Sequence, residues 1–328
     1  MSWTLVAEAK AWPLHEPFVI SRGSQTTTDT ILVTLIDGEG KRGRGEGCGV
    51  PYAGETPASM HKQIEAVRPE VEAGIDRQGL LRLLPPGGAR CALDAALWDL
   101  EAKRSHISAF ALAGVAHPRA VASAYTIGMR AIDAYEPAAA ARSKFQTLKI
   151  KAGNDDPVAA IAAARRGAPA SRFIVDPNQS WGVETLKTLA PALVDLGVVL
   201  LEQPIKVGDE AGLDGYRCPI PLCADELIND CSDLAKARGR FDVVNIKLDK
   251  TGGLTEALRL AELARAQGFE LMVGCMLGSS LGMAPAVVLA QQCAFVDLDG
   301  PLLQAEDWPE ALHYREGVIS PPEPALWG

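Results

Sequence analysis

The feature that most constrains the fold is a repeat of short apolar runs that begins after residue 119. Each run is rich in β-branched and apolar residues, and an Ala/Leu/Glu-rich amphipathic stretch follows it. This alternation is typical of βα units in a parallel sheet. The repeat predicts eight strands that close into a barrel: residues 122–127, 147–151, 173–176, 198–202, 221–224, 243–247, 270–273 and 295–298. The competing fold is an open doubly wound sheet, but no Gly-x-Gly-x-x-Gly motif follows the first strand.

The first third of the chain has a different pattern. Apolar and polar residues alternate over residues 1–50, which predicts antiparallel strands joined by a glycine-containing turn. Residues 56 to about 114 have a helical pattern, so this part resembles a small α+β domain. With 328 residues the chain exceeds a typical single domain. We therefore expect an α+β domain over residues 1–118, a barrel over residues 119–306, and a final segment, residues 307–328, that packs back on the first domain.

Charged residues stand at the ends of the predicted strands, where buried parallel strands are normally apolar. Five of them lie 25, 26, 23 and 22 residues apart, which is about one βα unit each time: Lys151, Asp176, Glu202, Asp225 and Lys247. This spacing places all five at the carboxyl-terminal mouth of the barrel, where active sites of such folds lie. Further charged residues at strand ends are Lys149, Asp297 and Asp299.

The three acidic residues of this set, Asp176, Glu202 and Asp225, predict a metal site. Three carboxylates at one end of adjacent strands repel each other unless a cation joins them. An all-oxygen ligand set suits a hard ion, Mg²⁺ first and Mn²⁺ second. Any one of these acids alone would be interpreted as a helix N-cap or a surface charge, but their common spacing favours metal binding.

The two lysines lie on strands two and six, at roughly opposite sides of the mouth. Lys151 and Lys247 would then approach opposite faces of a substrate held between them. Lysine is a poor base at its ordinary pKa of about 10.4, and burial together with neighbouring cations lowers that value. Lys149 is open to two interpretations: it supplies such a charge, or it faces outward in a surface salt bridge.

Five motifs, in this order, resemble those of the enolase superfamily in its muconate-lactonising subgroup: Lys149-Ile150-Lys151, Asp176-Pro177-Asn178, Glu202-Gln203-Pro204, Ala224-Asp225-Glu226 and Asn245-Ile246-Lys247-Leu248-Asp249-Lys250-Thr251-Gly252-Gly253. The resemblance covers almost the whole chain and implies a (β/α)7β TIM-like barrel with an N-terminal α+β capping domain. It implies that Asp176, Glu202 and Asp225 bind Mg²⁺, that Lys151 and Lys247 are the acid/base pair, and that Asn178 orients the ligands.

The absence of a histidine at any predicted strand end narrows the chemistry. The five histidines are His15, His61, His106, His117 and His313. This disfavours the mandelate-racemase branch of the superfamily, which uses a histidine base, and it disfavours a Ser/His/Asp hydrolase.

The run Asp297-Leu298-Asp299-Gly300 bears on the reaction. In the dipeptide epimerases of the subgroup an Asp-x-Asp at this place holds the substrate ammonium. Arg22, in a loop that covers the mouth in relatives, would bind a side-chain carboxylate, or it is a solvated loop residue. The resemblance therefore implies an L-Ala-D/L-Glu epimerase of murein peptide metabolism. Gly278 departs from the pattern, because some family members carry an acidic or larger residue there.

Two alternatives stay open. An o-succinylbenzoate synthase or an N-acylamino-acid racemase would share the site but has no ammonium to bind. A barrel that binds or scaffolds without turnover has no support in the sequence, since both candidate bases and all three candidate ligands are present.

Composition limits the partners. The net charge of −9 argues against nucleic acid or an anionic membrane, but it does not exclude a small anionic substrate. No signal peptide and no apolar run long enough for a membrane span is apparent. Seven scattered cysteines are interpreted as reduced thiols, so we expect a cytoplasmic protein. A homo-oligomer is compatible with the resemblance, and the number of subunits stays open.

Overall fold

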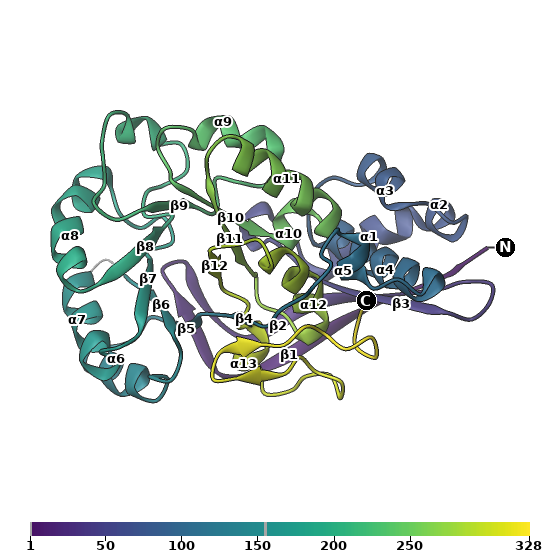
Figure 1. Cartoon of the computed structure of the whole chain (residues 1–328), viewed down its shortest axis with the longest axis horizontal. Helices are drawn as coiled ribbons and strands as arrows, with labels where there is room; N and C mark the ends of the chain where they lie inside the picture. Colours follow the sequence, from purple (N-terminus) through teal and green to yellow (C-terminus); the bar gives the residue numbers. More distant parts are fainter. Residues whose placement is uncertain (1, 154–155) are drawn as a thin grey trace.

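The computed structural model describes residues 2–153 and 156–328 and consists of a front α+β part and a barrel (Figure 1). The front part holds an antiparallel sheet of three strands in the order β1 (Thr4–Ile20), β2 (Gly23–Ile36) and β3 (Arg42–Cys48). Five α-helices of the described chain accompany it: α1 (Pro57–Ala66), α2 (Arg68–Glu72), α3 (Arg77–Leu83), α4 (Gly88–Ser105) and α5 (Ala109–Leu112). The strands and helices predicted from the two patterns of this region are confirmed.

Helix α4 packs on strand β3 at very short range. Gly43, Gly45 and Gly47 alternate along β3, and a Cβ atom at any of them would overlap backbone atoms of α4. Only glycine lets the helix approach this closely. Most residues of α4 are therefore buried, between the sheet and the barrel.

Eight parallel strands form the barrel and follow one another in sequence order, so the predicted fold class is confirmed. They are β5 (Tyr125–Ile127), β6 (Thr147–Lys151), β7 (Arg172–Asp176), β8 (Val198–Glu202), β9 (Leu222–Ala224), β10 (Val243–Lys247), β11 (Glu270–Gly274) and β12 (Phe295–Val296). The first and last strands meet where Ala124 N donates to Val296 O at 2.8 Å, which closes the barrel.

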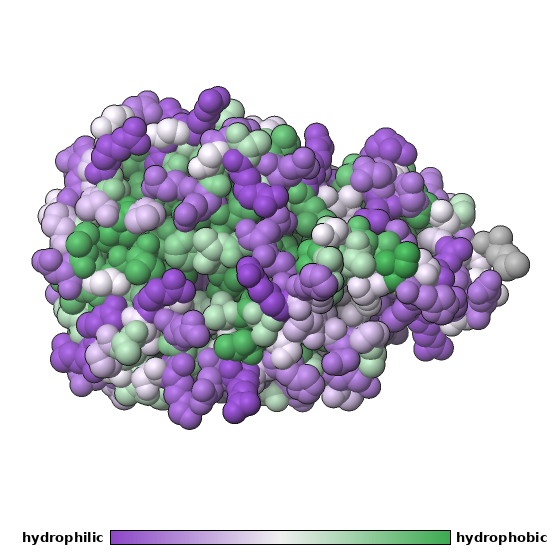
Figure 2. Space-filling model, viewed as in Figure 1, coloured by the Kyte–Doolittle hydropathy of each residue, from purple (hydrophilic) through white to green (hydrophobic). Residues whose placement is uncertain are grey.

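The connecting helices lie outside the strands, as Figure 1 shows. They are α6 (Ile132–Ala140), α7 (Pro157–Gly167), α8 (Val183–Asp195), α9 (Leu234–Ala237), α10 (Leu248–Thr251), α11 (Leu254–Ala266) and α12 (Ser280–Ala290), and α13 (Gly300–Leu303) follows the last strand. On the face shown in Figure 2, hydrophilic residues form most of the outer rim and apolar residues lie nearer the middle of the barrel. Among the described residues, no helix is long and apolar enough to cross a membrane.

Two details differ from the sequence-based expectation. The run at 122–127 is not one strand, because β4 (Val121–Ala122) turns away and pairs with β14 (Val318–Ile319) near the end of the chain. Between β8 and β9 the described chain forms only a short 3₁₀ turn, Glu210–Leu213, in place of an amphipathic helix. That connection carries several glycines and prolines, which disfavour a helix.

The end of the chain contacts helix α4. Trp327 Nε1 donates to Ala95 O at 2.9 Å, and Gly328 N donates to Asp99 Oδ1 at 2.7 Å. From the sheet, Arg44 donates to Leu326 O at 2.8 Å. These contacts join the last residues of the chain to the front part rather than to the barrel strands.

Buried carboxylates join the front part to the barrel. Asp94 on α4 accepts from Thr255 N at 3.0 Å, Glu46 on β3 accepts from Ser279 N at 2.8 Å, and Asp249 on α10 accepts from Cys48 N at 2.8 Å. Burial raises the pKa of Asp94 to about 6 and those of Glu46 and Asp249 to about 7. We call Glu46, Asp94 and Asp249 the seam carboxylates.

Candidate active site

The charged residues predicted from the repeat lie together at one end of the barrel. Lys151, Asp176, Glu202 and Lys247 are the last residues of β6, β7, β8 and β10, and Asp225 directly follows β9. All five are buried. They share one end because parallel strands of equal direction end on the same side of a barrel.

Lys149 faces inward, so its interpretation as an outward surface residue is wrong. Its ammonium lies 3.2 Å from Asp176 Oδ2, 2.7 Å from Glu202 Oε2 and 2.8 Å from Asp297 Oδ2. A strand residue two positions before Lys151 points to the same side of the sheet, which explains this orientation. One buried cation therefore joins carboxylates from three strands.

The two candidate bases approach from opposite sides of the mouth. Lys151 Nζ lies 2.6 Å from Asp176 Oδ2, and Lys247 Nζ lies 2.7 Å from Asp225 Oδ2. Their strands, β6 and β10, are four apart in an eight-stranded barrel, which is half of its circumference. A molecule held at the centre would have one lysine on each face.

Pairing with carboxylates sets the protonation of these groups. Burial would raise the pKa of Asp176, but Lys151 and Lys149 outweigh it and lower that pKa to about 2. Burial would lower the pKa of Lys247, but Asp225, together with Glu202 and Tyr52, outweighs it and raises that pKa above its ordinary value. The expected lowering of a lysine pKa is thus wrong for Lys247 in this arrangement, although the Lys149 charge does act in the expected direction.

Several contacts fit a cation among these carboxylates. Asn178 donates to Asp176 from N at 2.8 Å and from Nδ2 at 3.2 Å, and so orients it. Glu202 Oε2 is buried, and the Lys149 ammonium, 2.7 Å away, is its one partner among the described residues. Within residues 2–153 and 156–328, no group of three or more His, Cys, Asp or Glu side chains has the geometry of a preformed metal site. The donor set, three carboxylates on neighbouring strands, fits a hard divalent ion.

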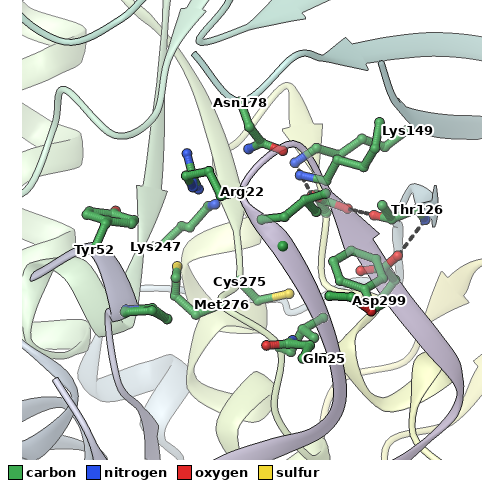
Figure 3. A pocket seen from close by; sticks show the side chains of 18 residues that line it. Arg22, Gln25, Tyr52, Thr126, Lys149, Asn178, Lys247, Cys275, Met276 and Asp299 are labelled. Carbon is green, nitrogen blue, oxygen red and sulfur yellow. Dashed lines mark hydrogen bonds and ion pairs between the residues drawn. The ribbon is translucent and has the colours of Figure 1, made fainter. Parts of the chain in front are cut away.

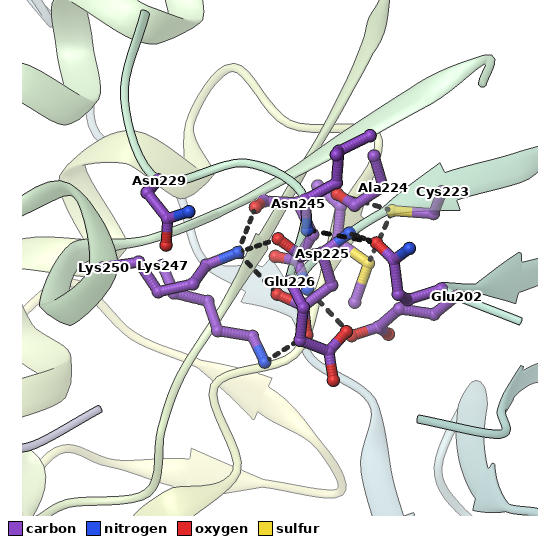
Figure 4. A network of polar contacts seen from close by, with 12 residues as sticks. Glu202, Cys223, Ala224, Asp225, Glu226, Asn229, Asn245, Lys247 and Lys250 are labelled. Atoms are coloured by element: carbon purple, nitrogen blue, oxygen red, sulfur yellow. Dashed lines mark hydrogen bonds and ion pairs between the residues drawn. The ribbon is translucent and has the colours of Figure 1, made fainter. Parts of the chain in front are cut away.

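Two buried polar residues beside Asp225 had no predicted role (Figure 4). Lys250 Nζ donates to Asp225 Oδ1 at 2.6 Å, from the side on which Lys247 also approaches. Asn245 Nδ2 donates to Glu202 Oε1 at 3.0 Å. Both lie in the motif around Lys247, but the repeat of strand ends does not include them, so their partners become visible only in the folded chain.

A cavity of about 420 Å³ opens above the lysines (Figure 3). The front part contributes residues from the β1–β2 hairpin and from the turn after β3, and the barrel contributes strand ends; the lining residues include Arg22, Gln25, Tyr52, Thr126, Lys149, Lys151, Asn178, Lys247, Cys275, Met276, Asp297 and Asp299. Asp176, Glu202 and Asp225 do not line it, because lysine ammonium groups cover their oxygens. The site thus lies between two parts of the chain.

The two ends of this cavity carry opposite charge. Asp297 and Asp299 follow β12, where Thr126 N donates to Asp299 Oδ2 at 2.5 Å. Burial and the neighbouring Asp297 raise the pKa of Asp299 to about 7. Arg22, at the hairpin tip, lines the cavity near Lys247 and Tyr52, on the side away from Asp299 (Figure 3).

Comparison with known proteins identifies the family. Residues 133–325 match the family model described as enolase C-terminal domain-like, and residues 2–114 match the N-terminal domain of mandelate racemase and muconate lactonizing enzyme. The chain belongs to the enolase superfamily. The resemblance in the sequence is thereby confirmed.

Members of this superfamily resemble the chain over nearly its full length. The L-Ala-D/L-Glu epimerase of Escherichia coli is 44% identical over 94% of this chain and 97% of that enzyme. An N-acetyl-D-glutamate racemase of a Pseudoalteromonas species is 41% identical over 91% and 95%. A structure from Agrobacterium tumefaciens, described as homologous to dipeptide epimerases with bound sodium, L-Ala-L-Glu and an ordered loop, has a TM-score of 0.97 and 42% identity, covering 99% of this chain and 100% of that one.

Gly278, which departs from the pattern of some superfamily members, has a local reason to be glycine. Its φ is +147°, a backbone conformation that side chains disfavour. A Cβ there would also lie 3.2 Å from Glu46 Oε1 and from Met283 Cε. In this superfamily member the position therefore serves the packing of the front sheet against the barrel.

Proposed function

We propose that the protein is a dipeptide epimerase that inverts the α-carbon of the C-terminal residue, with L-Ala-D/L-Glu as its substrate. The observation that carries the proposal is the cavity itself. It has a lysine on each side, two carboxylates at one end and a guanidinium toward the other. A dipeptide with an N-terminal ammonium and an acidic C-terminal side chain matches this order of charges.

Asp176, Glu202 and Asp225 would hold a divalent metal ion, with Mg²⁺ first and Mn²⁺ as a substitute. When bound, that ion supplies Lewis-acid stabilisation of the substrate carboxylate as the α-proton leaves. Asn178 would keep Asp176 in position through its two hydrogen bonds. Lys149 would keep a positive charge beside the same carboxylates.

Lys151 and Lys247 would exchange the proton. The lysine on one face accepts the α-proton as a neutral amine, and the lysine on the other face donates a proton as an ammonium. The α-carbon inverts because the proton leaves one face and arrives at the other. Both groups are amines, so the reaction runs in both directions by the same chemistry.

Asp297 and Asp299 would bind the substrate ammonium, and Arg22 would bind the side-chain carboxylate through its planar fork. The Asp297 carboxylate already accepts from Lys149 and from the Thr126 hydroxyl, whereas the Asp299 carboxylate accepts only from Thr126 N among the described residues. A cation beside Asp299 would stabilise its charged form. Asp299 is therefore the main ammonium partner in this proposal.

A second candidate is an N-acylamino-acid racemase, favoured by the similarity to the N-acetyl-D-glutamate racemase. Its substrate would use the same lysines and Arg22 but has no ammonium for Asp299. The proposed place of the dipeptide reaction is murein peptide turnover. A cytoplasmic location is supported by the cysteines, all seven of which are free thiols.

The deciding experiment is incubation with Mg²⁺ and L-Ala-L-Glu in D₂O, followed by NMR of the Glu α-proton. Loss of that signal with appearance of the L,D diastereomer supports the epimerase. Faster exchange of N-acetyl-glutamate than of the dipeptide favours the racemase. Exchange of neither would contradict both proposals and leave the o-succinylbenzoate synthase, or a binding or scaffolding role.

A further inference from the structure

The tip of the β1–β2 hairpin is attached to the barrel mouth at two points. Ser21 Oγ donates to Asn178 O at 3.3 Å, and Arg22 Nη1 donates to Glu226 Oε1 at 2.5 Å. Glu226 directly follows Asp225, at the end of β9. The Arg22–Glu226 pair therefore joins residues 204 positions apart, on the two parts of the chain that enclose the cavity.

Glu226 is the buried partner of this pair. Its side chain is 2% exposed, whereas that of Arg22 is 36% exposed. Asn178 Nδ2 donates weakly to the same oxygen at 3.4 Å, and Oε2 is buried without a hydrogen-bond partner among the described residues. A buried carboxylate with so few donors depends on its counter-ion. Glu226 thus holds Arg22 more firmly than an exposed acid would.

Arg22 has donors to spare. A guanidinium carries five N–H groups, and among the described residues Glu226 is the one acceptor to which Arg22 donates. The guanidinium also lies 5.5 Å from the centre of the Tyr52 ring. With one edge fixed, the remaining N–H groups are available to a ligand in the cavity.

The same pair stands between two cavities. Arg22 and Tyr52 line the cavity above the lysines, while Tyr52 and Glu226 line a second cavity of about 600 Å³. The polar residues that line the second cavity include Glu55, Gln63, Asn229 and Lys250. If Arg22 moved away from Glu226, the side-chain end of the first cavity would lose its boundary.

We propose that Glu226 is a specificity-determining residue that positions Arg22. It fixes the guanidinium at the boundary of the cavity, so that the C-terminal side chain of the substrate meets an oriented cation. The substrate class is then a dipeptide whose second residue ends in a carboxylate. This inference rests on the function proposed above and adds a residue that acts through Arg22.

The test compares two substrates in the E226Q variant. For L-Ala-L-Glu we expect KM to rise about tenfold with kcat within about twofold, since one charge-assisted contact loses its orientation. For L-Ala-L-Met, which has no side-chain charge, we expect KM to change less than about twofold. The preference for the acidic dipeptide then falls about tenfold, or about 1.4 kcal/mol. In an R22A background, E226Q should cause no further change in preference.

Matched variants distinguish a loss of Arg22 positioning from a general defect in the structure. D209N removes an exposed carboxylate that makes no capping hydrogen bond, and it should leave the kinetics with both substrates unaffected. E226D keeps the charge but shortens the side chain, and it should also raise KM for the acidic dipeptide alone, even if E226Q folds poorly. The concentration of Mg²⁺ that gives half-maximal activity should stay unchanged in both variants.

Three results would overturn the inference. An equal loss with both substrates indicates a structural role, a gain in preference for L-Ala-L-Glu indicates that Glu226 competes with the substrate, and an unchanged preference indicates no role. Each of them requires an active wild-type protein. An inactive wild type instead contradicts the proposed function itself, so the two failures are distinguishable.

Discussion

Two groups of buried carboxylates in this protein have opposite surroundings. At the mouth, Asp176 and Asp225 each lie within 2.7 Å of a lysine ammonium. At the seam, Glu46 and Asp94 accept hydrogen bonds from backbone N–H and hydroxyl groups of the barrel and have no ammonium partner among the described residues. The mouth lowers the pKa of Asp176 to about 2, while the seam raises that of Glu46 to about 7.

The comparison separates the effect of burial on the pKa of a carboxylate from the effect of a neighbouring cation. Neutral donors only partly replace water, so a seam carboxylate is close to its point of protonation at neutral pH. Ammonium groups at short range lower the pKa of Asp176 and Asp225 and keep both charged, whereas burial raises the pKa of Glu202, also at the mouth, to about 8 despite the nearby Lys149. The mouth is thus arranged for charged chemistry, and the seam is arranged to join two parts of the chain.

The sharpest test of the mouth is removal of either lysine. We expect K151A and K247A each to lower epimerisation about 10⁴-fold, the upper range for a general acid or base. Each variant should still exchange the α-proton of one diastereomer, because the other lysine remains. Chiral analysis together with deuterium incorporation measures both. K206A, at an exposed lysine, is the control, and normal epimerisation in either active-site variant would refute the two-lysine scheme.

Removal of metal tests the mouth carboxylates as a group. We expect chelation by EDTA to lower activity about 10³-fold, several kcal/mol of lost charge stabilisation, and Mg²⁺ to restore it. The melting temperature should rise with added Mg²⁺, because an ion that binds only the folded state stabilises it. D176N should abolish this rise, whereas E46Q at the seam should keep it. Full activity after exhaustive chelation would contradict the metal site.

The Asp299 prediction concerns the substrate ammonium. We expect D299N to raise KM for L-Ala-L-Glu about 10- to 100-fold, since a charged contact in a buried site is lost. KM for N-acetyl-L-glutamate, which has no ammonium, should change less than about twofold. Steady-state kinetics with both substrates check this, and D209N is again the control. Equal losses for the two substrates would argue for the racemase.

The smallest expected effect is the pH dependence of stability at the seam. Burial raises the pKa of Glu46 from 4.5 to about 7, so the folded state binds more protons than the unfolded state between these values. Its contribution is complete below about pH 4.5 and is lost as pH rises through about 7. Asp176 has the opposite sign, because its pKa is lowered from 3.8 to about 2, and its contribution is lost only as pH falls through that range.

Denaturant unfolding at pH 5 and pH 8 measures the seam effect. We expect the free energy of unfolding of E46Q to depend less on pH than that of wild type, by on the order of 2 kcal/mol. E39Q, at a side chain that is 71% exposed, should behave like wild type. An unchanged pH dependence in E46Q would mean that Glu46 is not the group that titrates.

The sequence predicted the mouth well because its residues repeat. Lys151, Asp176, Glu202 and Lys247 end four strands, and the strands recur with the length of a βα unit. A residue at a strand end can therefore be located in the sequence from the regular spacing between strand ends. The same reasoning placed the eight parallel strands of the barrel.

Residues outside the repeat could not be found in that way. Glu226 and Lys250 acquire their partners from the hairpin and from Asp225, through contacts that only the folded chain brings about. Asp94 lies within a helix that looks ordinary in the sequence, and its burial follows from the glycines of β3 and from the barrel behind it. Between β8 and β9 the described chain forms a 3₁₀ turn instead of an α-helix. The spacing between the two strand ends is still that of a βα unit, so the spacing predicted the strands correctly but not the helix.

The closure of the barrel has a consequence for how the protein is made. Asp299 accepts its hydrogen bond from Thr126, 173 residues earlier in the chain, and Ala124 pairs with Val296. At ribosomal speed those 173 residues take roughly ten to thirty seconds to synthesise. Until β12 is made, the outer edge of β5 lacks its partner in the barrel, and an unpaired strand edge is a template for pairing with other chains. Strand β12, which leads into the proposed ammonium site, is therefore also the strand that covers this edge and removes it as a site of aggregation.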